Sequence, residues 1–136
     1  MNVVLQRLEM NVSDSRNERH PFLDDLTADA ELASSVLRDR VVGRDDIRLL
    51  INAVGALYGG SQTPTFLETS DVRLVLEYEA VLKSGEKLSA TVIAVRNADG
   101  SVPRVSVRMS PLGAVLSIAT HLREMFSEQF PEEIFL

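Results

Sequence analysis

Few side chains in this sequence combine the residue type and spacing that acid–base, nucleophilic or metal chemistry requires. The absence of cysteine excludes thiolate catalysis, disulfides and cysteine-ligated zinc or iron–sulfur sites. His20 and His121 are the only histidines, and no Asp or Glu forms a recognisable metal motif with either. A Gly-x-Ser-x-Gly elbow, a phosphate loop and a dinucleotide fingerprint are also missing. We therefore expect neither a metal nor a cofactor, with His121 as an exposed or capping residue.

Three hydroxyl groups lie on otherwise apolar stripes, where chemistry or ligand binding could use them. They belong to Ser34, Tyr58 and Tyr78. A buried hydroxyl needs a hydrogen-bond partner, and a ligand can serve as one. For the apolar residues around them, ordinary core packing is the default interpretation.

Most carboxylates have a simpler explanation than catalysis. Asp45 and Asp46 fall in the first turn of a predicted helix, where the helix dipole favours negative charge. Asp24, Asp25 and Asp29 form an acidic cluster for which capping and solvation are the default. Four further charges fall on the outward faces of predicted strands and could pair across the sheet: Glu77, Glu79, Arg104 and Arg108.

The first half of the chain must supply two helices and a strand. Met1–Arg19 gives mixed signals and is left unassigned, whereas Phe22, Leu23 and Leu26 predict a short helix over His20–Leu26. Alternation predicts a strand over Ala30–Val36. A helical stripe after Gly43 predicts a helix ended by Gly59–Gly60, and its members are Ile47, Leu50, Ile51, Val54, Leu57 and Tyr58.

The second half predicts strands followed by a helix. A weak strand at Thr65–Thr69 precedes a clear one over Val72–Leu82, whose even-numbered side chains are apolar. Turns at Ser84–Glu86 and Asn97–Gly100 predict two more strands, Lys87–Arg96 and Arg104–Met109. An apolar helical repeat then runs from Leu112 through Leu116 and Phe130 to Pro131. We expect an α+β domain with an antiparallel sheet and helices covering one face.

Composition limits the classes of partner. The 136 residues suit one domain, and 45% hydrophobic content is ordinary for a globular protein. A net charge of −6 argues against nucleic acid. We expect no membrane association, since Leu112–Leu122 is too short to span a bilayer. Gln6, Arg7 and Glu9 interrupt the apolar N-terminus, so we expect no export signal and a cytoplasmic protein.

Several short motifs, in order and spacing, resemble SnoaL-like proteins of the nuclear-transport-factor-2-like superfamily. The resemblance covers Pro21–Leu122, and its most specific parts are the Gly-Arg-acidic-x-Ile helix start and the Pro-Leu pair after the last strand. The motifs are His20-Pro-Phe-Leu-Asp-Asp-Leu, Ser35-Val-Leu-Arg, Val42-Gly-Arg-Asp-Asp-Ile-Arg, Asn97-Ala-Asp-Gly and Met109-Ser-Pro-Leu-Gly-Ala-Val. The resemblance implies a cone in which a strongly bent sheet wraps a helix around a pocket, and a homodimer formed through the outer sheet face.

The superfamily includes ketosteroid isomerases, polyketide cyclases and hydrolases as well as non-catalytic domains, so fold alone does not give the reaction. By ungapped counting, Ser34 stands where the isomerases carry their aspartate base, and Val92 where they carry a protonated aspartic acid. Neither can do that chemistry. The family's arginine before the Pro-Leu pair is Ser110 here. These departures disfavour steroid-type isomerisation.

Our leading hypothesis is a SnoaL-like domain, residues 1–136, that binds a small, mostly apolar molecule in a pocket of roughly 300–1,000 Å³. Two alternatives stay open: an enzyme whose acid or base is a rim carboxylate, Asp24, Asp25 or Glu31, and a structural or protein-interaction domain with a filled interior. The predicted lining residues are Leu32, Ser34, Val36, Val54, Tyr58, Phe66, Tyr78, Val92, Val107 and Met109.

Overall fold

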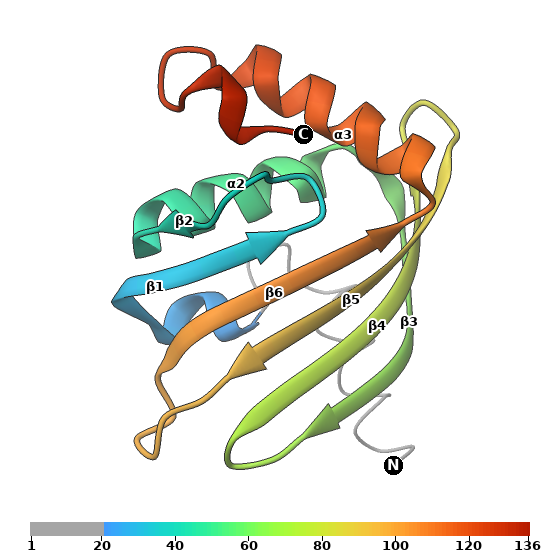
Figure 1. Cartoon of the computed structure of the whole chain (residues 1–136). Coiled ribbons are helices and arrows are strands. Elements are labelled where there is room, and N and C mark those ends of the chain that lie inside the picture. The colour runs from blue at the N-terminus through green and yellow to red at the C-terminus, as the bar shows by residue number, and fades with distance from the viewer. Residues whose placement is uncertain (1–20) are drawn as a thin grey trace.

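The computed structural model describes residues 21–136 (Figure 1). The unassigned segment Met1–Arg19, and His20, lie outside the described residues. The elements follow in the order η1 (Pro21–Asp25), β1 (Leu26–Ser34), β2 (Val41–Val42), α2 (Arg44–Ala56), β3 (Tyr58–Thr69), β4 (Arg73–Leu82), β5 (Lys87–Val95), β6 (Val102–Ser110), α3 (Leu112–Met125) and η2 (Glu132–Ile134). The predicted α+β class with a C-terminal helix is confirmed.

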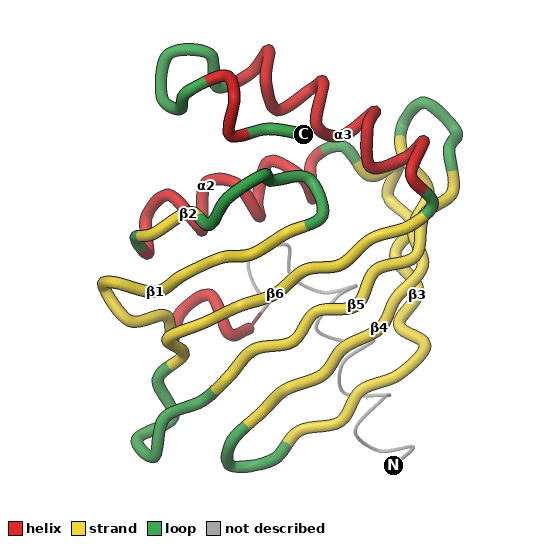
Figure 2. Tube along the Cα trace, viewed as in Figure 1, coloured by secondary structure: helices red, strands yellow, loops and turns green. Residues whose placement is uncertain are grey.

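One six-stranded, strongly curved sheet has the order β2-β1-β6-β5-β4-β3 (Figures 1 and 2). Strands β3 to β6 form an antiparallel meander, which confirms the prediction for the last three strands. The expectation of a wholly antiparallel sheet is wrong at one place, because β1 pairs with β6 in parallel. The chain between them includes α2 and four strands, and such a long crossover permits parallel pairing, whereas a hairpin does not.

The alternation in β4 turns its even-numbered residues inward as predicted, with one exception. Every second residue from Leu74 to Leu82 is buried. Val72, expected on the same face, is 61% exposed and precedes the strand. The hydroxyl of Ser70 accepts hydrogen bonds from the backbone N–H groups of Val72 and Arg73 at 3.2 and 3.1 Å. Val72 therefore lies in a turn, where the period of two does not apply.

Helix α2 begins where the sequence predicts and ends earlier. Gly43 adopts φ 118°, a conformation open to glycine, and its N–H donates to the Ala30 carbonyl at 2.9 Å. The helix stops at Ala56 rather than at Gly59–Gly60. Tyr58 pairs with Leu82 and starts β3, so this tyrosine reaches the interior from a strand and not from the helix.

Helix α3 is also shorter than expected, because it ends at Met125 rather than near Pro131. The N–H of Phe130 still donates to the Phe126 carbonyl at 3.1 Å, but this part of the chain is a turn. Leu112 and Leu116 are exposed although the repeat included them. The buried face consists of Ala114, Val115, Ile118, Ala119 and Leu122.

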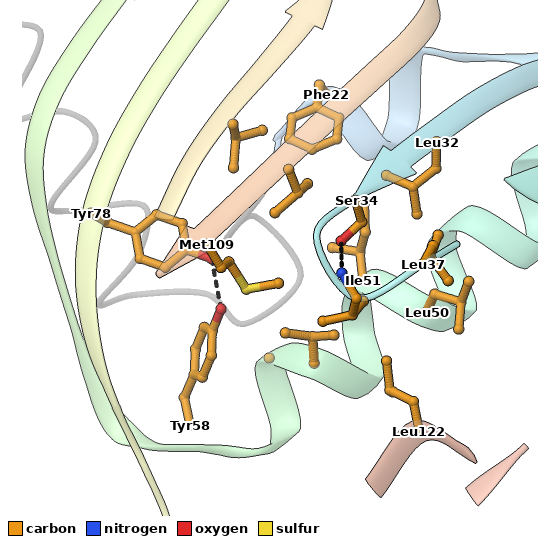
Figure 3. A pocket seen from close by; sticks show the side chains of 15 residues that line it. Phe22, Leu32, Ser34, Leu37, Leu50, Ile51, Tyr58, Tyr78, Met109 and Leu122 are labelled. Carbon is orange, nitrogen blue, oxygen red and sulfur yellow. Dashed lines mark hydrogen bonds between the residues drawn. The ribbon is translucent and has the colours of Figure 1, made fainter. Parts of the chain in front are cut away.

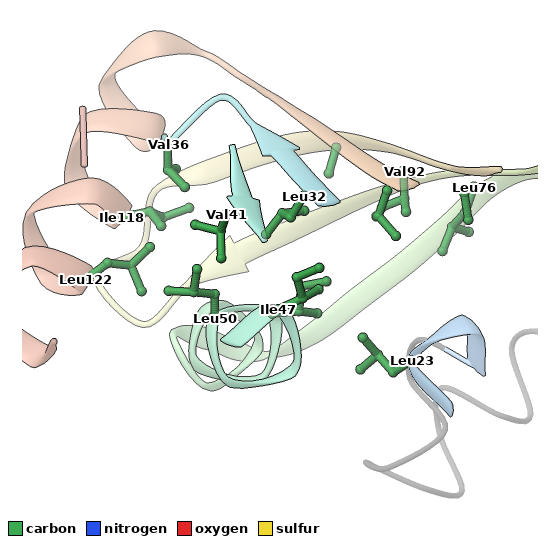
Figure 4. Close-up of a cluster of buried hydrophobic side chains, with 14 of the residues drawn as sticks. Leu23, Leu32, Val36, Val41, Ile47, Leu50, Leu76, Val92, Ile118 and Leu122 are labelled. Carbon is green, nitrogen blue, oxygen red and sulfur yellow. The ribbon is translucent and has the colours of Figure 1, made fainter. Parts of the chain in front are cut away.

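The core lies between the concave side of the sheet and the two helices. Figure 4 shows its side chains in a row from Val92 and Leu76 on the sheet to Ile118 and Leu122 on α3. The C-terminal residues close one end, since Phe135 is 1% exposed and pairs with Leu37 in an isolated β-bridge. Within residues 21–136, no helix combines the length and apolar character that crossing a membrane requires.

Candidate functional site

A cavity lies between α2, the end of α3 and the inner face of the sheet (Figure 3). Its walls combine the C-terminal half of α2 with β1, β3, β4, β5 and β6. Fifteen residues line it: Phe22, Leu32, Ser34, Val36, Leu37, Leu50, Ile51, Val54, Gly55, Tyr58, Tyr78, Val92, Val107, Met109 and Leu122. None carries a carboxylate, imidazole, ammonium or guanidinium group. The polar side-chain atoms that line the cavity are hydroxyls.

The two tyrosines form the polar centre of the cavity. Their hydroxyl oxygens are 2.7 Å apart, which is a hydrogen bond, and each residue is 5% exposed. The rings meet edge to face, with centroids 6.0 Å apart and an interplanar angle of 63°. Figure 3 shows the two side chains pointing toward each other from β3 and β4. This pair places phenol groups inside an otherwise apolar space.

Ser34, the third hydroxyl, has a local structural role. It lies at the end of β1, and its oxygen accepts a hydrogen bond from the N–H of Val36 at 3.3 Å. This contact belongs to the turn that carries the chain away from the strand. Ser34 can still accept or donate a further bond on the cavity side.

The cavity is narrow. The space open to the centre of a water molecule is about 30 Å³. One water needs roughly 10–15 Å³ by this measure, so the cavity has room for about two. The expected pocket of roughly 300–1,000 Å³ is therefore wrong for this conformation, because large side chains such as Met109, Ile51 and Leu122 fill most of the space.

Nine of the ten residues proposed from the sequence come together at this cavity, and Phe66 does not. The register of the β3–β4 pair shifts between Pro64 and Phe66. Pro64 pairs with the inward-facing Tyr78, but after this bulge Phe66 pairs with the outward-facing Glu77. An added residue in one strand reverses the face of the residues that follow it. Phe66 therefore lies on the outer face.

Six lining residues were missing from the sequence-based set. Leu50 and Ile51 belong to the helical stripe already recognised in α2, so that stripe is a signal that could have found them. Gly55 lies one turn further along the same helix. Phe22, Leu37 and Leu122 reach the cavity from η1, the β1–β2 connection and α3, and no local pattern predicts that these segments meet.

The rim carboxylates do not reach the cavity. Asp24 and Asp25 are exposed on η1, and neither lines it. Glu31 faces away and accepts a hydrogen bond from Arg40 at 2.8 Å, with both side chains well exposed. Within residues 21–136, no group of three or more His, Asp or Glu side chains is arranged to hold a metal ion.

The predicted ion pairs across the outer sheet face do not form. Strand β5 lies between β4 and β6, so Glu77 faces Thr91, and Thr91 faces Arg108. Glutamates on β4 and arginines on β6 are thus two strands apart, beyond direct contact. The Arg40–Glu31 contact is the one salt bridge found in the described part of the chain.

Comparison with solved structures shows the fold. An uncharacterised protein from Silicibacter pomeroyi DSS-3, described as having a cystatin-like fold, superposes with a TM-score of 0.75 at 12% identity, over 90% of this chain and 86% of that one. A steroid delta-isomerase from Pseudomonas aeruginosa gives 0.73 at 14% identity, over 92% and 90%. A candidate SnoaL-like polyketide cyclase from Jannaschia sp. CCS1 gives 0.56 at 13% identity, over 86% and 88%.

This is the fold of the SnoaL-like and nuclear-transport-factor-2-like proteins. The resemblance stated from the motifs is confirmed at this level. No protein-family model and no curated protein matches the sequence. In this SnoaL-like fold, Ser34 and Val92 both line the cavity. The positions at which the sequence comparison expected acids thus do lie at the cavity, and neither carries one.

Proposed function

We propose that this domain binds a small, mostly apolar molecule in the cavity and does not catalyse a reaction on it. The observation that carries the proposal is the chemistry of the lining: twelve of the fifteen residues have no polar side-chain atom, and the other three have a hydroxyl. General acid–base catalysis is most often carried out by an imidazole, carboxyl or amine group within reach of the reacting atoms. Among the described residues, no side chain with an imidazole, carboxyl or amine group lines this cavity.

The tyrosine pair would orient the ligand. A phenol hydroxyl both donates and accepts, so Tyr58 and Tyr78 can exchange a hydrogen bond with an oxygen of an otherwise apolar molecule. The apolar walls supply affinity through burial, and a few polar groups fix orientation, as in most small-molecule sites. A monocyclic alcohol or ketone has this chemistry.

Entry requires the lining to yield. Met109 has a flexible, unbranched side chain that adopts several rotamers at little cost, and it lies beside both tyrosines (Figure 3). Val54 and Met109 are only partly buried, so the wall they form is not fully packed. We propose that rotation of Met109 enlarges the cavity when the ligand binds.

Cyclohexanone is a suitable probe for this proposal. Titration followed by methyl-resolved NMR should shift the resonances of Val92, Val107 and Met109. A Val54→Phe variant fills the cavity from α2 and should abolish the shifts. Leu49→Phe is the matched control, since Leu49 is 41% exposed on the same helix and does not line the cavity. Shifts that persist in Val54→Phe would contradict the proposed site.

A second candidate function is a structural or protein-interaction domain whose interior is filled by its own side chains. The small open volume, about 30 Å³, favours it. The two candidates differ in one outcome: an interaction domain shows no saturable response to cyclohexanone in any variant. An enzyme with a rim carboxylate has no such support, because Asp24, Asp25 and Glu31 do not line the cavity.

We further propose that the whole chain forms one domain that is a cytoplasmic homodimer. The lack of cysteine fits a reducing compartment. The outer sheet face combines half-buried Val75 and Ile93 with exposed charges such as Glu77 and Arg108, a mixture common at interfaces between subunits. Light scattering should show twice the 15.0 kDa chain mass at micromolar concentrations. A measured mass equal to that of one chain at all micromolar concentrations would contradict the proposed dimer.

A further inference from the structure

A second cavity lies outside the central one, between α3 and the turn that joins β4 to β5. Figure 1 shows this turn beside α3. The volume that the centre of a water molecule can occupy is about 40 Å³, compared with about 30 Å³ in the central cavity. Its residues are Leu57, Leu82, Lys83, Ser84, Ser117, Ile118 and His121. It therefore has an apolar floor and a rim of one ammonium, one imidazole and two hydroxyl groups.

The backbone around this cavity is fixed by hydrogen bonds. The N–H of Lys83 donates to the carbonyl of Leu57 at 2.9 Å, which joins the turn to the chain before β3. Within the turn, Leu82 N–H donates to Glu86 and Gly85 N–H to Leu82, both at 2.8 Å. The floor is rigid as well, since Ile118 is fully buried and Leu82 nearly so. The cavity is thus formed before anything binds.

The imidazole of His121 is held in one orientation. Its Nδ1 lies 2.8 Å from the carbonyl oxygen of Ser117 one turn earlier. A carbonyl oxygen can only accept a hydrogen bond, so Nδ1 carries the proton. Nε2 is the ring nitrogen that does not take part in this contact. Among residues 21–136, neither Nε2 of His121, nor the Lys83 ammonium, nor the Ser117 hydroxyl makes a hydrogen bond or ion pair.

The charge of the cavity is opposite to that of the protein. The chain has a net charge of −6, yet no carboxylate lines this cavity. The nearest on the turn, Glu86, accepts a hydrogen bond from the Ser84 hydroxyl at 3.2 Å. On α3, Arg123 and Glu124 follow His121 without lining the cavity, and the Arg123 guanidinium donates to the Phe135 and Leu136 carbonyls at the C-terminus. Lys83 is left as the cation that faces the cavity.

We propose that this cavity binds the carboxylate group of a small aliphatic acid. Lys83 and Ser117 would donate to the carboxylate oxygens, with the His121 ring beside them at the rim. Leu57, Leu82 and Ile118 would contact the short aliphatic part. This apolar floor disfavours inorganic phosphate, which offers no apolar surface to bury and loses hydration on entering. The site is independent of the central cavity and of the function proposed for it.

Butyrate is the probe, titrated at constant ionic strength against ¹⁵N- and ¹³C-labelled protein. The imidazole of His121 and the amide of Ser117 should shift saturably with one affinity. No saturable shift, or an equal affinity for phosphate, would overturn the proposal.

Paired charge variants separate a specific site from general attraction. Lys83→Met should weaken butyrate binding about fivefold, the upper range for one exposed ion pair. Lys87→Met is the matched control, because it removes the same charge from the outer face of β5 and should leave the affinity unchanged. Equal weakening by both lysine variants would overturn the proposal, and unchanged amide spectra without butyrate would show that all variants remain folded.

Discussion

The hydroxyl pair of Tyr58 and Tyr78 offers the most sharply defined perturbation of the central cavity. Replacing either tyrosine by phenylalanine removes one oxygen from a 2.7 Å hydrogen bond and keeps the ring. The edge-to-face ring contact, with centroids 6.0 Å apart, should therefore survive in both variants. Only the polar interaction changes.

The expected magnitude follows from burial. Both residues are 5% exposed, so water does not replace the hydrogen bond that either substitution removes. Leaving a buried polar group unsatisfied costs about 1–3 kcal/mol, and the net value of one hydrogen bond is about 1 kcal/mol. Tyr58→Phe and Tyr78→Phe should each lower the free energy of unfolding by about 1–3 kcal/mol, and the double variant by about 1 kcal/mol less than their sum.

A double-mutant cycle measured by urea unfolding tests this expectation. The cycle cancels whatever other contacts each hydroxyl makes, so the coupling energy reports the pair alone. Far-UV circular dichroism is the appropriate signal, because the chain has no tryptophan and these are its two tyrosines. A coupling energy below about 0.3–0.5 kcal/mol, the range found for independent sites, would contradict a stabilising hydrogen bond between the two hydroxyls.

Three further outcomes are expected. Leu122→Ala should lower the free energy of unfolding in urea by about 2–5 kcal/mol, because Leu122 is fully buried, whereas Leu116→Ala on the same helix, 45% exposed, should change it by less than about 0.5 kcal/mol. Hydrogen bonds from the Ser101 side chain and then its backbone N–H lower the pKa of Asp99, so the stabilisation of the β5–β6 turn should be present near neutral pH and be lost as pH falls through that lowered pKa. Amide exchange in the turn would measure this, and an equal response in Asp99→Asn would contradict it. Phe66→Ala should leave the cyclohexanone-induced NMR shifts unchanged, because Phe66 does not line the cavity. Loss of these shifts in the variant would contradict the placement of Phe66 on the outer face.

Much of the fold could be predicted because local periodicity and burial agree. The period of two in β4 holds from Leu74 to Leu82, and the stripe in α2 marks its buried face correctly. Predictions failed where tertiary pairing decides the structure. Tyr58 fits a helical stripe but pairs with Leu82 in a strand, and the parallel contact of β1 with β6 joins segments separated by most of the chain.

The lining of the cavity could be predicted where it follows alternation, and not beyond that. Tyr78, Val92 and Val107 are inward positions on regular strands, so period alone places them. Phe66 fails because a bulge, for which the sequence has no clear signal, reverses its face. The free volume was also beyond prediction, because it depends on how the side chains from α2, α3 and the sheet pack together.

Native mass spectrometry of the full chain, freshly purified and then incubated with cyclohexanone, would show directly whether the central cavity binds a small apolar molecule. We expect one added molecule per chain in the unmodified protein and in Leu49→Phe, and none in Val54→Phe. Binding of no molecule to any of the three proteins, together with unshifted methyl resonances of Val92 and Met109, would contradict a ligand-binding cavity and leave the filled interior of an interaction domain.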